Sequence, residues 1–305
     1  MQQYVDLVKY VLNNGTKRVT RQGGHTIGVF APPDFIHNMA TGFPVLTTKK
    51  MAWKMAMQEM LWFISGSTNI NDLGIARPLW QPYADIDGYV HGNYGEQWRY
   101  WRDGYDEPID QLKILIRNLR RNPYSRRHVV LAWNPAEIDR IEDKYLPALP
   151  ELKLAALESL KLPPCHAMFQ VYVETNPGGE KYISLKMYQR SADIAVGVPF
   201  NIVGYGLLLE LLAREIGAIA HRLIISYGDA HIYAEHIEAI STQIRRPCYK
   251  LPELRISRRD KTPVTLGVLA PGIPEKPANL FTAKLGNISL ENYVSHAGIK
   301  YAFLP

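Results

Sequence analysis

The sequence has 305 residues, of which 47% are hydrophobic and 10% aromatic, so it can bury a large globular core. Only two cysteines are present, which excludes a disulfide framework and favours a reducing, cytoplasmic setting. The formal charge of +6 favours anionic partners, either nucleic acid or small phosphorylated and carboxylated ligands. We expect neither a secretory signal, because no basic segment leads into an apolar core, nor a membrane span.

The first half of the chain alternates helical and extended patterns. Helical spacing of Tyr4, Val8 and Val11 predicts an amphipathic helix over 2–14 that ends at Gly15. The next expected elements are loop and strand (16–30), a very apolar helix (51–65), a loop-rich region of aromatics and glycines (74–106), a helix from Asp106 or Asp110 to Asn122, and a buried strand (129–133).

The second half begins with a segment of different composition, 141–161, which we expect to be a surface insertion with a short helix. The elements expected after it are a hairpin (168–174 and 182–189, with a turn at 176–179), a helix (200–216), a strand (223–227), a helix (231–245) and a proline-rich tail from 247. No repeat or long linker interrupts the chain. The pattern therefore predicts one α+β domain over 1–305.

Cys165 follows Leu162-Pro163-Pro164, precedes His166, and stands directly before a strand-like stretch. The two prolines restrict the backbone and should present the thiol in one orientation. A cysteine here is either a small buried hydrophobe, the commonest fate of a free cysteine, or a nucleophile that reacts as its thiolate. Taken alone, the position favours the buried hydrophobe.

A polar run, Gln189-Arg190-Ser191-Ala192-Asp193, ends the second hairpin strand and leads to Pro199-Phe200-Asn201. Such groups destabilise a fold when they are buried without partners. They form either a structural ion pair with a capped helix or a binding pocket. In the pocket, Arg190 and Ser191 bind phosphate and Asp193 accepts a ring N–H. The Asn201 amide then donates to a carbonyl oxygen and accepts from an imide N–H, the pattern that uracil presents.

Several motifs together resemble the thymidylate synthase family. They are Arg21, FPVLTTKK (43–50), QEMLWF (58–63), LW (79–80), YG (94–95), SRRH (125–128), PPCH (163–166), QRSADIAVGVPFN (189–201) and YGDAHIY (227–233). They run in order along nearly the whole chain, apart from 141–161 and part of the tail. The resemblance implies an α+β fold with a large twisted mixed sheet, flanked by helices, that forms a homodimer interface. It also implies one-carbon transfer from methylenetetrahydrofolate to C5 of a pyrimidine nucleotide.

The resemblance assigns the chemistry to a Cys165 thiolate, which adds to C6 of the base and makes C5 reactive. Arg190 is expected to lower the pKa of this thiol. Glu59 is implied as the general acid and base for protons at O4, C5 and an ordered water. The other residues implied to be catalytic are Tyr94, His166, Asp193 and Asn201.

Four arginines resemble the family's phosphate ligands, since planar guanidiniums donate in pairs to phosphate oxygens. They are Arg21, Arg126, Arg127 and Arg190, with Arg126 and Arg127 supplied by the partner subunit. Without the resemblance, 125–127 would be interpreted as a solvated turn. The other implied substrate-binding residues are Gln189, Ser191, Asn201, His231 and Tyr233, the last two at the sugar 3′-hydroxyl.

The folate side of the pocket is implied to consist of Lys49, Trp80, Tyr83, Leu162, Asp193, Gly197 and Phe200. Lys49 and Lys50 either attract the glutamate tail of the folate or are a plain surface pair. The histidines lack metal-ligand spacing, so we expect no metal requirement.

The substrate is expected to be dUMP, because Asn201 stands where the cytosine-specific hydroxymethylase has aspartate and Ser191 where a ribonucleotide-using relative has alanine. Two products remain. Reductive methylation gives dTMP and dihydrofolate in a closed, dry pocket and has the higher base rate. Addition of water gives 5-hydroxymethyl-dUMP, as in phages that replace thymine in their DNA.

Four departures from the family pattern favour water addition by a narrow margin. The chain ends in Phe303-Leu304-Pro305 where a small aliphatic residue is usual, Tyr83 stands where a second tryptophan is usual, and Gln81 and Asn93 resemble the hydroxymethylase branch. A nucleic-acid-binding protein is the alternative from another class. It is disfavoured because the arginines are scattered and form no basic stripe.

Overall fold

The structure is a computed structural model that describes residues 1–20, 24–102, 107–135, 162–257 and 279–302. Arg21, the expected insertion at 141–161 and the last three residues of the tail lie outside the described residues.

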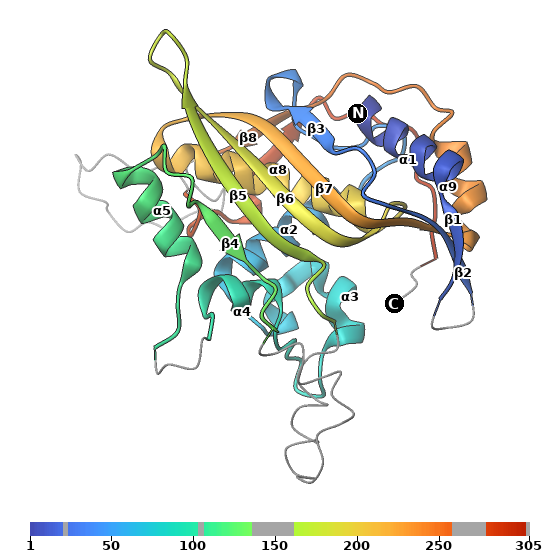
Figure 1. The fold of residues 1–305 in the computed structure, drawn as a ribbon, viewed down its shortest axis with the longest axis horizontal. Helices are drawn as coiled ribbons and strands as arrows, with labels where there is room; N and C mark the ends of the chain where they lie inside the picture. The colour runs from blue at the N-terminus through green and yellow to red at the C-terminus, as the bar shows by residue number, and fades with distance from the viewer. Residues whose placement is uncertain (21–23, 103–106, 136–161, 258–278, 303–305) are drawn as a thin grey trace, which may run out of the picture.

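A mixed, twisted sheet of seven strands runs through the molecule, in the order β1-β2-β7-β6-β5-β4 with β3 also paired to β7 (Figure 1). The strands are β1 (Thr16–Val19), β2 (His25–Phe30), β3 (Phe35–Asn38), β4 (Val129–Leu131), β5 (His166–Thr175), β6 (Lys181–Asp193) and β7 (Ile219–Tyr233). Among the described strands of this sheet, only β6 and β7 pair in parallel, so their carboxyl ends lie side by side at the same end of the sheet.

Two long helices, α2 (Trp53–Ser65) and α8 (Gly197–Ile216), lie together behind the sheet in Figure 1. The remaining elements are α1 (Gln2–Asn14), η1 (Met39–Thr41), η2 (Ile70–Ala76), α3 (Arg77–Trp80), η3 (Gln81–Tyr83), α4 (Tyr94–Arg99), α5 (Gln111–Arg121), η4 (Ala234–His236), α9 (Ile237–Gln243), β8 (Glu253–Ile256), η5 (Leu285–Asn287) and β9 (Ile288–Glu291). The predicted α+β fold, with helices flanking a large mixed sheet, is confirmed.

Helix boundaries follow local chemistry. α2 ends at Gly66, whose φ of +81° is left-handed and favours glycine. α5 begins at Asp110, whose side chain accepts a hydrogen bond from the backbone amide of Lys113. α8 is apolar on nearly all sides and is buried between the sheet and α2. The predicted helices at 2–14 and 51–65, the hairpin and the long helix from 200 are confirmed within four residues.

Three local predictions are wrong. The expected helix over 231–245 starts only at Ile237, because β7 continues to Tyr233 with Ala230 and Ile232 buried between half-exposed neighbours. Such alternation is typical of a strand. The expected loop region over 74–106 contains short helices, among them α3 and α4. The strand expected to be buried over 129–133 ends at Leu131 and buries only Val130, because it pairs with β5 alone at the sheet edge. Of the described helices, none combines the length and the apolar character that a membrane span needs.

Candidate active site

The predicted site residues meet at the end of the sheet where β5 begins and β6 and β7 end. His166 at the start of β5 lies opposite Gln189 of β6, and His231 of β7 lies beside Asp193. The start of α8 adds Gly197, Phe200 and Asn201, and the helices behind the sheet add Glu59, Trp80, Tyr83 and Tyr94. Apart from Arg21, Arg126 and Arg127, the structure therefore brings the predicted residues to one region.

Hydrogen bonds hold the Cys165 backbone on both sides. Its amide donates to the Tyr94 hydroxyl at 2.8 Å, and its carbonyl accepts from the Arg190 amide at 2.8 Å. The Arg190 side chain donates to the carbonyls of Pro164 at 2.9 Å and of Pro163 at 2.7 Å. The segment before the thiol is therefore fixed by the arginine as well as by the two prolines.

The predicted effect of Arg190 on the Cys165 thiol is confirmed in its direction, but it is not the larger of the two effects that act on this pKa. Burial raises the pKa of the thiol, and this outweighs the nearby guanidinium, which lowers it. The thiol is thus predominantly protonated in the ligand-free protein at neutral pH.

Glu59 lies in the middle of α2 and accepts a hydrogen bond of 2.6 Å from the Trp80 indole N–H. Burial raises the pKa of this carboxyl from 4.5 to about 7, although the indole N–H opposes the shift. A carboxyl with a pKa near 7 can both donate and accept a proton at physiological pH. The side chain therefore suits the predicted acid and base.

Four side chains form a polar chain between β5, β6 and α8. Gln189 donates through its Nε2 to the Asn201 Oδ1 at 3.0 Å, which fixes the Asn201 amide. His166 interacts with Asn201 and stacks on the Tyr94 ring, with centroids 4.6 Å apart. Burial lowers the pKa of His166 to about 4, so its imidazole is neutral at pH 7.

Two buried polar atoms of this polar chain lack hydrogen-bond partners. Among the described residues, the buried Oε1 of Gln189 and Nδ1 of His166 have no hydrogen-bond partner. A buried polar atom without a partner is costly, so these atoms favour a site that binds a polar molecule. The residues present therefore fit a nucleotide base at this place.

Asp193 ends β6 and turns the chain into α8. Its Oδ1 accepts from the amides of Ala195 at 2.9 Å and Val196 at 3.3 Å, and burial raises the pKa of the carboxyl. Asp193 therefore holds the turn before α8. The capped helix of the structural interpretation is wrong, because the N-cap of α8 is Val196 and no side chain caps it.

Lys49 differs from a surface lysine. It is 7% exposed, donates to the Ala195 carbonyl at 2.9 Å, and lies 4.3 Å from the centroid of the Tyr301 ring. Burial lowers the pKa of its ammonium group to about 8. The surface-pair alternative is wrong for Lys49, whereas Lys50 is exposed.

The sugar and folate sides are lined from different elements. His231 contacts Asp229 at 3.2 Å and packs edge-on against Tyr233, while Ser191 is half-buried on β6. On the other side Tyr83 packs edge-on against Trp80 with centroids 5.9 Å apart. Leu162 and Phe200 are partly buried against the core. A Cβ at Gly197 would meet only ordinary contacts, so this glycine is not required by the local backbone.

A family model described as thymidylate synthase matches residues 2–304. The chain belongs to the thymidylate synthase family. It is therefore an enzyme, a one-carbon transferase that uses dUMP and a folate co-substrate. The match confirms the resemblance found in the sequence, and the roles of individual residues stay predictions.

Two of the family's implied phosphate ligands, Arg126 and Arg127, lie on an exposed turn before β4, where the Arg126 carbonyl accepts from the Gln170 side chain in the middle of β5. His128, buried beneath the turn, contacts the carbonyls of Asn122 and Pro123 at 3.1 Å each. Among the described residues, neither arginine forms an ion pair. The contacts of His128 hold this turn, and the side chains of Arg126 and Arg127 on it are exposed.

Sequence reasoning missed Trp133 in this family member. The Arg190 guanidinium lies 5.0 Å from its ring centroid, which adds a cation–π contact to the two carbonyl contacts. The indication was available, because Trp133 ends the predicted strand at 129–133. In the part of the chain that the structure describes, no group of three or more potential metal ligands is present. The absence of a metal requirement stays a prediction.

Proposed function

We propose that this thymidylate synthase family member transfers its one-carbon unit to C5 of dUMP through a covalent bond between Cys165 Sγ and C6 of the base. The observation that carries the proposal is the fixed Cys165 backbone, held by Tyr94 on one side and Arg190 on the other. Because burial keeps the thiol protonated, its proton passes to water as sulfur adds to C6, and the electron pair of the C5–C6 double bond shifts towards C5 and O4. This addition gives C5 the electron density that it lacks in free uracil.

Glu59 is the acid and base in this proposal. With a pKa near 7 it can protonate the base oxygen at O4 and later accept a proton, directly or through water. The Trp80 indole N–H holds the carboxyl in one orientation. Tyr94 fixes the Cys165 amide, so thiol and carboxyl are positioned by separate helices.

Uracil is the base that the polar chain around Asn201 fits best. Because Gln189 donates to the Asn201 Oδ1, the Asn201 amide N–H₂ is directed to a carbonyl oxygen of the ligand. The remaining lone pair of the Asn201 Oδ1 is available to the imide N–H of the base. The neutral His166 behind it adds no positive charge.

A homodimer completes the phosphate site in this proposal. The sheet face turned to the viewer in Figure 1 is not covered by any described helix. Strand register places on this one face the exposed Tyr172 and Tyr188, which are 53% and 39% exposed, together with Ile36, Val129 and Leu131. The partner we assign to this apolar face is a second copy of the chain.

The charges on this face agree with a second copy. Arg190 follows Tyr188 on the same side of β6, and the Arg126–Arg127 turn lies at the edge of the same face, where Gln170 donates to the Arg126 carbonyl at 3.2 Å. A partner's turn laid across the face would bring its two unpaired cations toward Arg190. Such a cluster of guanidiniums needs a phosphate dianion between its members.

For the product we infer 5-hydroxymethyl-dUMP, formed when water adds to the one-carbon unit. The supporting observation is Tyr83, which packs on Trp80 and whose pKa is raised by burial and by the nearby Cys165 and Tyr233. A phenol hydroxyl at this place can both donate to and accept from a water beside the reacting carbon, whereas an indole N–H can only donate. The alternative, dTMP with dihydrofolate, needs water to be excluded. Asn93, the other resemblance to the hydroxymethylase branch near this place, is the buried N-cap of α4.

The product test incubates the purified chain with dUMP and methylenetetrahydrofolate. The mass of the nucleotide and the absorbance of dihydrofolate are then measured. A hydroxymethyl nucleotide without dihydrofolate supports the proposal. A methylated nucleotide with an equal amount of dihydrofolate contradicts the water reaction and leaves one-carbon transfer intact.

We further infer that residues 1–305 act as one catalytic domain, because the family match spans nearly all of them.

A further inference from the structure

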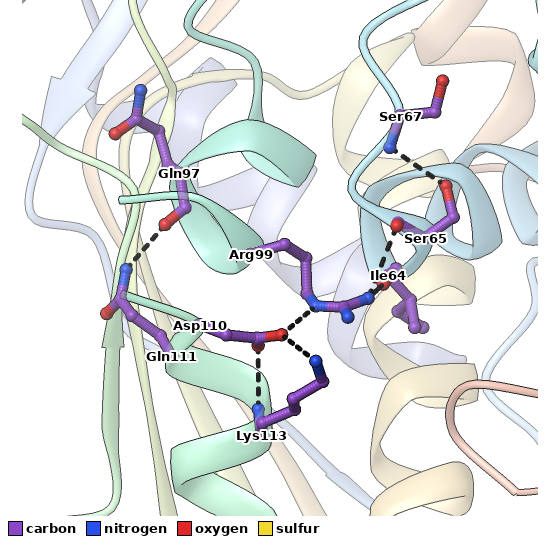
Figure 2. Close-up of polar contacts among 8 residues, drawn as sticks. All are labelled: Ile64, Ser65, Ser67, Gln97, Arg99, Asp110, Gln111 and Lys113. Carbon is purple, nitrogen blue, oxygen red and sulfur yellow. Dashed lines mark hydrogen bonds and ion pairs between the residues drawn. The ribbon is translucent and has the colours of Figure 1, made fainter. Parts of the chain in front are cut away.

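Arg99, the last residue of α4, connects three helices (Figure 2). Its Nε donates to the Asp110 carboxylate at 2.9 Å, and its Nη1 donates to the backbone oxygens of Ile64 at 2.7 Å and Ser65 at 3.4 Å. The other oxygen of Asp110 accepts from the backbone amide of Lys113 at the start of α5. One side chain therefore contacts the end of α2 and the beginning of α5.

This arrangement is not a solvated surface pair. The side chains of Arg99 and Asp110 are only 12% and 19% exposed. Ile64 and Ser65 lie in the last turn of α2, where carbonyls lack partners within the helix and the helix dipole is negative. The guanidinium also stacks on Phe281, 4.6 Å from its ring centroid. A partly buried cation here satisfies carbonyls that would otherwise lack a donor.

The two helices joined by Arg99 approach each other at backbone distance. A Cβ at Gly95 of α4 would lie 3.0 Å from the Phe63 carbonyl and 3.2 Å from the Gly66 Cα. A Cβ at Gly66 would lie 2.8 Å from the Arg99 Cβ. Such close packing lets a small shift at Arg99 move α2 against α4 as a unit.

Both helices carry active-site groups. Glu59 lies in the middle of α2, and Tyr94 begins α4 and accepts the Cys165 amide. The ring centroids of Phe63 on α2 and Tyr94 on α4 are 4.7 Å apart, so these two side chains pack the helices against each other. The separation of Glu59 from Cys165 therefore depends on how α2 sits against α4.

We propose that Arg99 is a positioning residue that fixes α2 against α4. This keeps water away from the Glu59 carboxyl beside Trp80, while Tyr94 holds the backbone of Cys165. The inference rests on the proposed function and adds to it a residue that contacts neither substrate. Arg99 acts by bridging the two helices and by placing a positive charge at the carboxyl end of α2.

Loss of Arg99 would admit water to the end of α2. A cavity of about 650 Å³ lies against this end and is lined by Ser65, Gly66, Ser67 and Tyr100, among others. The groups that face the Glu59 carboxyl are the Trp80 N–H from α3 and the Tyr94 hydroxyl from α4. Neither is a cation, so desolvation is the main cause of the raised pKa of Glu59. Water near α2 would bring that pKa down.

The test compares Arg99→Met and Arg99→Lys with Asp110→Asn, which removes the charge and keeps a side-chain oxygen for the Lys113 amide. Arg120→Met is the matched control, because it removes an arginine of α5 that pairs with Glu215 of α8 and not with Asp110 or the end of α2. The pKa of Glu59 is measured by carbon-13 NMR of labelled glutamate carboxyls, assigned with Glu59→Gln. The kcat and KM for dUMP are measured on the same proteins.

For Arg99→Met we expect the pKa of Glu59 to fall by about one unit and kcat to fall about tenfold to a hundredfold, with little change in KM. Arg99→Lys and Asp110→Asn should show smaller changes in the same direction, and Arg120→Met none. Unchanged pKa and kcat in either folded Arg99 variant overturn the inference, as does an equal loss in Arg120→Met. If Arg99→Met does not fold, Arg99→Lys and Asp110→Asn decide the question. A wild-type protein without dUMP turnover would contradict the proposed function, while the NMR titration would still test Arg99.

Discussion

The Tyr94 hydroxyl accepts hydrogen bonds from the backbone amides of Cys165 at 2.8 Å and of His166 at 3.3 Å. A buried side chain on α4 thereby substitutes for a backbone acceptor at the point where β5 begins. The nucleophile and its neighbour are thus fixed by a residue far away in the sequence, and the first prediction concerns this contact.

Tyr94→Phe removes the hydroxyl and leaves two amides without an acceptor. Each unsatisfied buried amide costs about 1–3 kcal/mol, so we expect a loss of stability of this order. We also expect kcat to fall about tenfold or more, because the thiol is no longer held in one orientation. Urea unfolding and steady-state kinetics measure the two effects. A variant with wild-type kcat would show that the contact does not orient the thiol.

Arg190→Gln should raise the pKa of the Cys165 thiol further. The guanidinium is the group that opposes the effect of burial on this thiol, so its removal leaves burial unopposed. The pH dependence of alkylation by iodoacetamide reports the thiolate fraction. Alkylation at pH 8 should be slower in the variant than in wild type and in an Arg120→Met control. Faster alkylation would mean that Arg190 shields the thiol instead of favouring its ionisation.

Glu59→Gln should stabilise the protein at pH 8 and change little at pH 5. The carboxyl has a pKa of about 7 in the folded protein and about 4.3 in an unfolded chain, so between these values the folded state binds the additional proton. Stability of the wild type therefore falls as pH rises through this window, by at most about 2–3 kcal/mol. Glutamine does not titrate and avoids this loss. Unfolding curves at both pH values measure it, and parallel pH dependence of the two proteins would contradict the raised pKa.

Tyr172→Glu should weaken the proposed dimer. The substitution places a charge on the uncovered sheet face, where it would be buried between two copies at a cost. Tyr10→Glu, on the exposed side of α1, is the control. Sedimentation velocity should show a concentration-dependent monomer only for the Tyr172 variant. A wild type that is monomeric at all concentrations would contradict the dimer.

Local sequence signals predicted much of the fold and part of the site. The alternating pattern around 168–174 and 182–189, the turn between them, and the apolar helices at 51–65 and from 200 all have causes within a few residues. Of the site, local signals indicated the polar run at 189–201 as a possible pocket, whereas Cys165, Glu59 and Tyr94 were assigned roles only through the resemblance to the thymidylate synthase family. The same local reasoning was wrong at 231–233, because pairing of β7 with β2 and β6 extends the strand beyond its apolar centre.

The sign of the pKa shift of Cys165 could not be predicted from the sequence. It depends on two opposing effects, burial and the Arg190 charge, and burial is a property of the whole fold. The burial of Lys49 has a similar origin, because Tyr301 and the turn at Ala195 cover it from distant parts of the chain. Arg99 belongs to the same class, since its contacts come from α2, α5 and Phe281.

The most direct measurement follows the hydrogen at C5 of the base. With dUMP labelled with tritium at C5, one-carbon transfer through a Cys165–C6 bond must release the label to water as product forms. We predict release by wild type only when methylenetetrahydrofolate is present, and at least a thousandfold less (roughly 10³ or more) by Cys165→Ala. Equal release by wild type and Cys165→Ala would contradict the covalent role of this thiol.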